Sequence, residues 1–213
     1  MSLISDISMS VDGFVAGPDA DLDDPLGQGG ERLHEWILGL ESWRDPHGLE
    51  GGERTPDDDV VREGRSRTGA VIMGRRMYSG GSGPWEQDPK AEGWWGEEPP
   101  FETPVFVLTH HARERKAMPN GHHFHFVTDG IEAALEQARA AAGDKDVLVA
   151  GGGEAIQQYL AAGLLDEVQL HVPPVLLGDG VRLFAAGVHA GALEIDRVVA
   201  SPAVTHLRYR VVR

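Results

Sequence analysis

The chain has 213 residues, no cysteine and a formal net charge of −15 at pH 7, from 19 Lys and Arg against 34 Asp and Glu. The acidic excess disfavours nucleic acid and anionic membranes as partners, and the lack of cysteine excludes disulfides and thiolate chemistry. The length suits one domain, 1–213. A start with Asp6 in place of a cationic, apolar leader, and no apolar run of membrane-spanning length, predict a cytoplasmic protein.

The first elements follow from hydrophobic spacing. Residues 3–11 alternate between apolar and polar, which predicts a strand with one face in the core. In residues 31–40 the apolar side chains recur at helical spacing, which predicts an amphipathic helix. Residues 44–60 and 79–103 are rich in Gly, Pro and acidic residues, so we expect two long loop insertions, candidates for lids or oligomer contacts. Two adjacent tryptophans argue against a plain linker in the second.

The middle of the chain alternates strands and helices. Strands are predicted at 70–74, 104–109, 123–128 and 147–150, with helices at 130–143 and after the glycines at 151–153. This order is typical of an α/β fold with parallel strands. After residue 165 three strand-like segments follow without a comparable helix, at 166–172, 193–201 and 204–212, so antiparallel pairing is predicted there.

Three consecutive glycines stand where the strand at 147–150 gives way to a helix. A bare backbone at a helix N-terminus suits a phosphate, because unpaired N–H groups and the helix dipole attract anions. The dinucleotide fingerprint fails because Ile156 stands where its last glycine belongs, and the phosphate-loop lysine is missing. A tight packing turn remains the alternative interpretation.

Two further strand ends carry groups suited to anions. Gly74 is followed by Arg75 and Arg76, and cations at a helix start are unfavourable unless an anion joins them. The 108–116 segment gathers hydroxyl, imidazole and basic side chains, which suits the 2′-phosphate of NADP. Solvated charges are the alternative at both places. Three such junctions fit one long ligand, so the sequence indicates a dinucleotide.

No metal site is expected. The acidic run at 19–24 has Asp24 where a calcium loop needs glycine, and Gly30 where it needs glutamate. His123 and His125 could share a strand face but lack a third ligand nearby.

The motifs MSVDGFVAG, VIMGRR, VFVLTH, VLVAGGGEAIQQYL and PPVLLGDGVRLF stand in an order that resembles the dihydrofolate-reductase fold, especially the reductase domain of riboflavin biosynthesis and its stand-alone relatives. The resemblance implies a three-layer α/β/α fold with a mixed, mostly parallel sheet of about eight strands and an antiparallel C-terminal hairpin. It also implies NADPH as cofactor, a homodimer, and a bond between Gly151 and Gly152 similar to the family's cis peptide. The cofactor contacts it implies are Val15, Ala16, Gly74, Arg75, Arg76, Thr109, His110, Arg113, Gly151, Gly152, Gly153, Glu154, Ala155 and Ile156.

Strand one and helix one line the substrate pocket in this family, which nominates Ser8, Trp36 and His34 for substrate binding. Asp6 and Asp12 are the candidate catalytic residues, as proton donors to a C=N or C=O group that receives hydride, and water is the alternative donor. Such an acid needs a pKa raised by burial. Capping of a turn is the alternative role for Asp12. The implied function is NADPH-dependent reduction of a pyrimidine- or pterin-like heterocycle, most like 5-amino-6-(5-phosphoribosylamino)uracil. Dihydrofolate reduction and non-catalytic NADP(H) binding remain alternatives.

Overall fold

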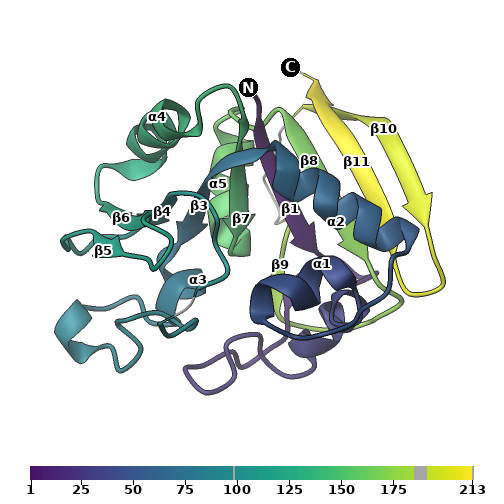
Figure 1. Ribbon diagram of the computed structural model, residues 1–213, viewed down its shortest axis with the longest axis horizontal. Coiled ribbons are helices and arrows are strands. Elements are labelled where there is room, and N and C mark those ends of the chain that lie inside the picture. Colours follow the sequence, from purple (N-terminus) through teal and green to yellow (C-terminus); the bar gives the residue numbers. More distant parts are fainter. Residues whose placement is uncertain (98, 185–190, 213) are drawn as a thin grey trace.

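Most strands of the computed structural model form one large sheet (Figure 1). Residues 1–97, 99–184 and 191–212 are described. Within them, nine strands are arranged in the order β10-β11-β8-β1-β7-β3-β4-β6-β5. The parallel strands are β1 (Leu3–Ser8), β3 (Thr68–Gly74), β4 (Val105–Leu108), β6 (His123–Val127), β7 (Asp146–Gly151) and β8 (Glu167–Val172). The antiparallel strands are β5 (Lys116–Ala117), β10 (Ala192–Ala200) and β11 (Thr205–Val212).

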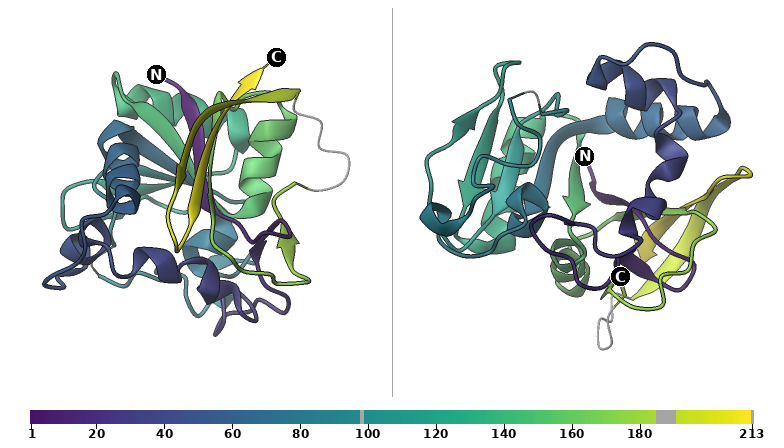
Figure 2. Two further views of the ribbon diagram at one scale, coloured as in Figure 1. Left: turned by 90° about the vertical axis from the view of Figure 1, so that its right-hand side faces the viewer. Right: turned by 90° about the horizontal axis from the view of Figure 1, so that it is seen from below.

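Helices cover both faces of this sheet. Helices α4 (Gly130–Ala142) and α5 (Gly153–Ala161) lie on one face, and α2 (Pro56–Arg67) lies on the other (Figures 1 and 2). The buried side chains of α4 and α5 join apolar residues of β1, β3 and β7 in the main core. The predicted three-layer, mostly parallel fold and its antiparallel C-terminal strands are therefore confirmed, with nine strands in the sheet instead of about eight.

A second apolar cluster explains the tryptophans of the 79–103 segment. Tyr78, at the end of the short helix α3 (Arg75–Ser79), is fully buried and meets Phe124 of β6 at 5.1 Å between ring centroids. Trp85, in the 3-10 turn η4 (Trp85–Gln87), and Trp95 pack against the same cluster. The described part of the segment is a loop, as predicted, and its aromatic side chains pack against the large sheet of the same chain.

The prediction of one amphipathic α-helix at 31–40 is wrong in the type of helix. The structure has two 3-10 turns, η1 (Gly30–Leu33) and η2 (Glu35–Ile37). Gly29 enters η1 in a left-handed conformation, and the glycines at 30 and 39 weaken any longer helix across this stretch. Leu33 and Leu40 are nevertheless buried, so the apolar spacing correctly identified the inward side.

The long loop predicted at 44–60 is also wrong in part. Short turns α1 (Glu41–Arg44) and η3 (Asp45–His47) precede the long helix α2, which begins inside the supposed loop. Thr55 caps α2 by accepting a hydrogen bond from the Asp58 N–H, and Pro56 occupies its first turn. A cap residue, a proline and three aspartates are typical of a helix start. The sequence therefore contains a local signal for this helix, within a Gly-, Pro- and acid-rich composition that is typical of a loop.

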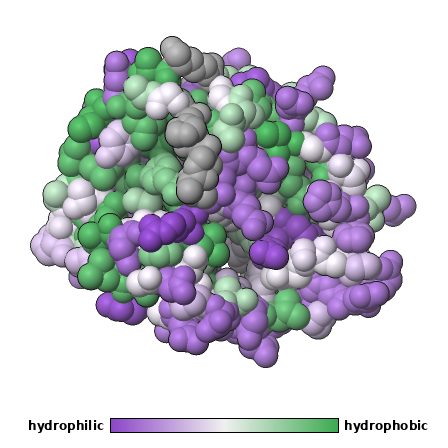
Figure 3. All heavy atoms as spheres, turned by 180° about the vertical axis from the view of Figure 1, so that it is seen from behind, coloured by the Kyte–Doolittle hydropathy of each residue, from purple (hydrophilic) through white to green (hydrophobic). Residues whose placement is uncertain are grey.

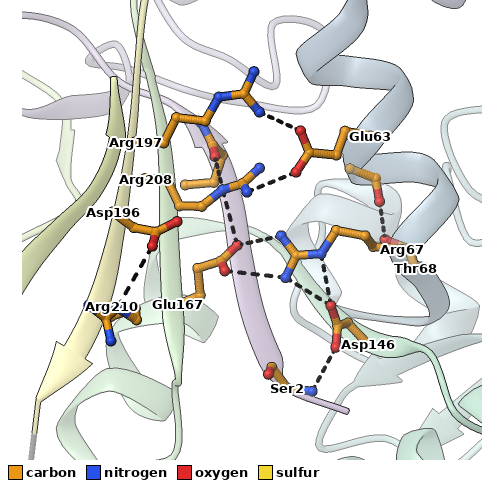
Figure 4. A network of polar contacts seen from close by, with 12 residues as sticks. Ser2, Glu63, Arg67, Thr68, Asp146, Glu167, Asp196, Arg197, Arg208 and Arg210 are labelled. Carbon is orange, nitrogen blue, oxygen red and sulfur yellow. Dashed lines mark hydrogen bonds and ion pairs between the residues drawn. The ribbon is translucent and has the colours of Figure 1, made fainter. Parts of the chain in front are cut away.

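Ion pairs hold α2 to the sheet (Figure 4). Arg67, in its last turn, contacts Glu167 of β8 and Asp146 of β7, both at 2.9 Å. One turn earlier, Glu63 receives Arg208 of β11 at 2.8 Å and Arg197 of β10 at 2.5 Å. Because these contacts are specific in direction, they fix the position of the helix and therefore of its first turn.

A small second sheet lies beside the main one. It pairs β2 (Phe14–Ala16) with β9 (Val181–Arg182) in antiparallel fashion. Neither strand was predicted, since both are too short to show a period. Among the described residues, no helix is long and apolar enough to cross a membrane.

Candidate functional site

The three strand ends that the sequence singled out lie along one edge of the sheet. Strands β7, β3 and β4 are parallel neighbours, with Met73 paired to Gly151 and Gly74 paired to Leu108. Their carboxyl ends therefore open onto the same side, and the glycine turn, the Arg75 junction and the segment after Leu108 are adjacent. Ligands of open α/β sheets bind at such edges.

The three glycines of the turn have different reasons to be glycine. Gly151 has φ +133°, which a side chain rarely adopts, and the Gly151–Gly152 bond is cis, as the resemblance implied. A Cβ on Gly153 would stand 2.9 Å from the Val15 side chain. Gly152 has φ −66° and no described atom within 4 Å of its Cβ position. The fold thus requires the outer two glycines, while the middle one leaves room for a group from outside.

The helix that follows leaves donors for such a group. Gly152 is the N-cap of α5, and no side chain caps this end among the described residues. The Ala155 and Ile156 N–H groups donate to the Gly152 carbonyl, and their side chains are buried in the core. These two residues therefore shape the turn instead of lining it with side chains, and the positive end of the helix dipole points to the edge.

The two arginines after Gly74 have different positions. Arg75 is buried: it donates to Asp88 at 2.5 Å, its guanidinium lies 3.5 Å from the Trp85 ring centre, and its Nε and Nη1 find no described partner. Arg76 is 67% exposed and lies 3.6 Å from Glu154, itself largely exposed. Arg76 is therefore free to turn to an anion, whereas Arg75 holds the 79–103 segment.

The third junction also differs from the simple expectation. Thr109 is buried, and its hydroxyl accepts the His111 N–H at 3.1 Å, while His110 is exposed. Arg113 is occupied by Glu92 and by the Ala91 carbonyl. Sequence reasoning missed both partners of Arg113 because they lie more than twenty residues away. Of the groups singled out here, His110 has the most accessible side chain.

Val15 and Ala16 belong to β2, at the side of the glycine turn. Val15 is buried against Gly153, so its part is to support the turn. The Ala16 carbonyl lies 2.1 Å from the Cβ position of Gly180, in the loop before β9. Both residues thus position the backbone around the turn.

Asp12 caps a loop, although the loop is at 177–178 and not the strand-end turn before Gly13 that was its alternative role. It accepts the N–H groups of Leu177 at 3.2 Å and Gly178 at 2.7 Å. The Ser10 hydroxyl has the largest effect and, together with these two N–H groups, lowers the pKa of Asp12 to about 2, although desolvation opposes them. The raised pKa expected of a proton donor is therefore wrong for this residue.

We expect Asp12→Asn to lower the melting temperature at pH 7. The folded-state pKa lies below the ordinary 3.8, so the stabilisation is complete above pH 3.8 and is lost as the pH falls toward 2. Thermal unfolding followed between pH 7 and pH 2 checks this, with the exposed Asp23→Asn as a charge-matched control. A melting-temperature difference that stays constant down to pH 2 would contradict the prediction.

The other nominated residues gather on the α2 side of β1. The Trp36 indole N–H donates to the Ser8 hydroxyl at 3.2 Å, and the Trp36 ring lies 4.9 Å from the His171 ring. Asp6 meets His171 at 2.6 Å. His34 is the fourth member of this group. Burial and the nearby charge of His171 lower the pKa of His34. The structure therefore brings Asp6, Ser8, Trp36 and His34 together and leaves Asp12 elsewhere.

The expected raised pKa is also wrong for Asp6. Burial raises the pKa of Asp6, but the facing His171, with His206 and Arg208 behind it, lowers the pKa by a larger amount. The pKa of Asp6 is therefore below its usual value. His171 and His206 were missed by sequence reasoning. Each sits at an alternating position of a predicted strand, and a polar residue pointing into a core was the available signal.

Metal-ligating side chains do not assemble a cation site in the part of the chain that is described. The His123 and His125 rings lie 5.9 Å apart, without a third ligand from the described residues.

The order of the sheet and its two covering layers define a dihydrofolate-reductase-like α/β fold. A putative riboflavin biosynthesis protein from Shewanella sp. PV-4 superposes with a TM-score of 0.64 at 21% identity, over all of both chains. A diaminohydroxyphosphoribosylaminopyrimidine deaminase/5-amino-6-(5-phosphoribosylamino)uracil reductase from Thermotoga maritima gives 0.58 at 15% identity, covering 99% of this chain and 56% of its own.

The chain belongs to the RibD C-terminal domain family, whose model matches residues 1–207. Among curated proteins, the uncharacterized protein YyaP of Bacillus subtilis strain 168 is 24% identical over 185 residues, which are 85% of this chain and 79% of that protein.

Proposed function

We propose that this protein is an NADPH-dependent reductase of a pyrimidine- or pterin-like heterocycle, with a reaction most like that of 5-amino-6-(5-phosphoribosylamino)uracil reductase. The observation that carries the proposal is the open space at Gly152, at the N-terminus of α5 and on the carboxyl edge of the sheet. A pyrophosphate there would receive backbone N–H groups and the positive helix end. Membership of the RibD C-terminal domain family supports the same reading.

Different residues along the edge of the sheet would bind different parts of the cofactor. Gly151, Gly152 and Gly153 would take the pyrophosphate, with Arg76 as the exposed cation beside it. Thr109 and His110 follow β4, where the 2′-phosphate is expected, although the Thr109 hydroxyl already serves a turn. NADPH supplies the hydride when bound. The chain's own task is to orient the acceptor carbon, exclude water and provide a proton.

The substrate side is proposed at Asp6, Ser8, Trp36 and His34. Asp6 is 29% exposed in its side chain, and the Trp36 ring provides a flat apolar surface on which a planar heterocycle can stack. The 79–103 segment packs on the β3, β4 and β6 side instead. That arrangement favours an enzyme over a protein that only binds the nucleotide.

Dihydrofolate reduction is less well supported. Dihydrofolate reductases hold the pterin with an acidic residue of helix one, one turn before an aromatic, whereas the residues one turn before Trp36 are Arg32 and Leu33. The first long helix, α2, starts with carboxylates. Here Asp57 and Asp58 stand in the first turn of α2, but Asp57 contacts His206 at 3.1 Å, and Asp58 accepts the Ser42 N–H at 2.7 Å. Neither carboxylate is free to take a pterin.

We expect NADPH to bind at least about ten times more tightly than NADH, because charge-assisted hydrogen bonds to the 2′-phosphate add more than 1.4 kcal/mol. Titration with either nucleotide, followed by energy transfer from tryptophan to the reduced nicotinamide, measures both dissociation constants. Equal affinities would remove the 2′-phosphate assignment, and binding of neither would remove the reductase assignment. Neither nucleotide would bind if the glycines at 151–153 were needed only for packing of the turn.

A homodimer is part of the proposal. Leu193, Ile195 and Val198 are exposed on the outer strand β10, and Figure 3 shows hydrophobic atoms gathered on the side of the molecule formed by β10 and β11. An apolar surface of this kind suits a second copy.

A further inference from the structure

Four titratable side chains form a continuous row on the α2 side of the sheet. His171 Nε2 lies 2.6 Å from Asp6 Oδ1, and His171 Nδ1 lies 2.6 Å from His206 Nδ1. His206 Nε2 lies 3.1 Å from Asp57 Oδ1. The members come from β1, β8, β11 and α2, with β1, β8 and β11 adjacent in the sheet. His171 and His206 are a direct cross-strand pair.

The row runs from the candidate site into the interior. The side chain of Asp6 is 29% exposed, whereas those of His171, His206 and Asp57 are only 6%, 2% and 8% exposed. The Trp36 ring lies within 5.1 Å of both imidazole rings, measured between ring centres. Asp6 is therefore the outer end, and Trp36 shields the two histidines beside it.

The geometry fixes the number of protons in the row. Two Nδ1 atoms at 2.6 Å cannot both be bare or both be protonated, so exchange between His171 and His206 involves one shared proton. Three contacts in the row need three protons, one in each. Two neutral imidazoles supply two. The third must reside on a carboxyl group or make one imidazole cationic, which leaves the four groups with a net charge of −1.

The surroundings do not hold this third proton at one place. Burial and the charge of His171 lower the pKa of His206, in spite of the opposing Asp57. The pKa of Asp6 is also lowered, as described above. Arg208 from β11 and His34 from the 30–37 segment face the row, and Arg208 is itself paired with Glu63 of α2. These two directions disfavour the third proton on Asp6 and on His206 at rest, so it reaches Asp6 only when the row passes it on during turnover.

We infer that Asp6, His171, His206 and Asp57 form a proton relay that stores one proton and delivers it through Asp6 to the substrate. For its substrate the inference rests on the proposed reductase function. Asp6 is the catalytic residue, since it alone reaches the candidate site. His171, His206 and Asp57 act through it as positioning residues.

NADPH would supply the hydride by breaking one of its own C–H bonds, which leaves NADP⁺, and a C–H bond would form at the carbon of a C=N group. The π pair would move to nitrogen, and nitrogen would take the proton of Asp6. Asp6 is protonated for this step by three short proton transfers. They run from the Asp57 O–H to His206 Nε2, from the His206 Nδ1–H to His171 Nδ1, and from the His171 Nε2–H to Asp6. Water then restores the lost proton at the exposed Asp6.

The proton count can be measured without substrate or cofactor. In protein labelled with ¹⁵N-histidine, we expect the ring nitrogens of His171 and His206 to titrate together, with one proton coupled to both Nδ1 atoms. Asp57→Asn should change the nitrogen shifts of both rings, whereas Asp59→Asn, an exposed neighbour in the same helical turn, should change neither. Two imidazoles that titrate independently would overturn the relay.

Turnover provides the second test, with 5-amino-6-(5-phosphoribosylamino)uracil as the probe. We expect Asp57→Asn to slow reduction at saturating NADPH by at least about tenfold and to shift the pH profile, because proton donation contributes about 10²–10⁴-fold. Asp57→Glu should recover part of the rate, and Asp59→Asn should retain it. NADPH affinity should be unchanged in all three variants.

The two tests separate the relay from the proposed function. If the unchanged protein reduces the probe but Asp57→Asn has the same rate and pH profile, the relay is wrong and the reductase assignment stands. If the unchanged protein does not bind NADPH, the reductase assignment fails, and the nitrogen titration alone decides for or against the proton row.

Discussion

Replacing Asp88 by alanine is expected to lower the free energy of unfolding by about 3 to 5 kcal/mol, the usual cost of removing one partner of a buried ion pair. The Arg75 and Asp88 side chains are only 6% and 1% exposed and meet at 2.5 Å. Without Asp88 the guanidinium stays buried with no hydrogen-bonding carboxylate, and Ser79 loses its acceptor as well. Denaturant unfolding followed by tryptophan fluorescence measures the loss.

Two controls sharpen this expectation. The exposed Glu86→Ala lies in the same segment and should change the free energy of unfolding little. A double variant, Arg75→Met with Asp88→Leu, should be more stable than Asp88→Ala alone, because it removes both charges together. If Asp88→Ala unfolds at the same denaturant concentration as the unchanged protein, the pair does not anchor the 79–103 segment.

Gly152→Ala is expected to weaken NADPH binding by about 10- to 100-fold while leaving the fold intact. The added methyl group would enter space that the chain leaves open, at an ordinary φ of −66°. Overfilling a packed contact costs about 1–3 kcal/mol, which corresponds to that range of affinity. The nucleotide titration and a thermal melt on the same sample measure both effects.

The matched control is Gly39→Ala. Its Cβ position is also open, with no described atom within 4 Å, and it lies outside the glycine turn. It should therefore leave NADPH affinity unchanged. Gly152→Ala protein that binds NADPH as tightly as the unchanged protein would show that the space at Gly152 is not the pyrophosphate site.

Elements with a local signature were predictable. The strands at 70–74 and 147–150 and the helix at 130–143 were found because apolar periodicity reflects burial residue by residue. The 31–40 stretch kept its inward side chains but lost its helix type, since glycines around it limit how far a helix can extend. Helix α2 was not predicted, although Thr55 and Pro56 are typical of a helix start, because the acidic and glycine-rich composition around them is also typical of a loop.

The partners of the candidate residues were not predictable. Asp88 and Glu92 take Arg75 and Arg113 from positions thirteen and twenty-one residues away, and only the folding of the 79–103 segment brings them close. In the same way Asp6 meets His171 across 165 residues. A sequence carries no distance between such groups, so their charges and pKa directions were beyond its reach.

The sequence by itself determined the strands at 70–74 and 147–150, the helix at 130–143, the glycine turn at 151–153 and the polar groups at three strand ends, because backbone conformation and apolar spacing are local properties. The tertiary structure alone decided which of these groups are free. It buried Arg75, used Asp12 as a cap, and joined Asp6, His171, His206 and Asp57 into one row. Chemistry of this kind depends on distance and burial, and both are set only when strands remote in sequence become neighbours in the sheet.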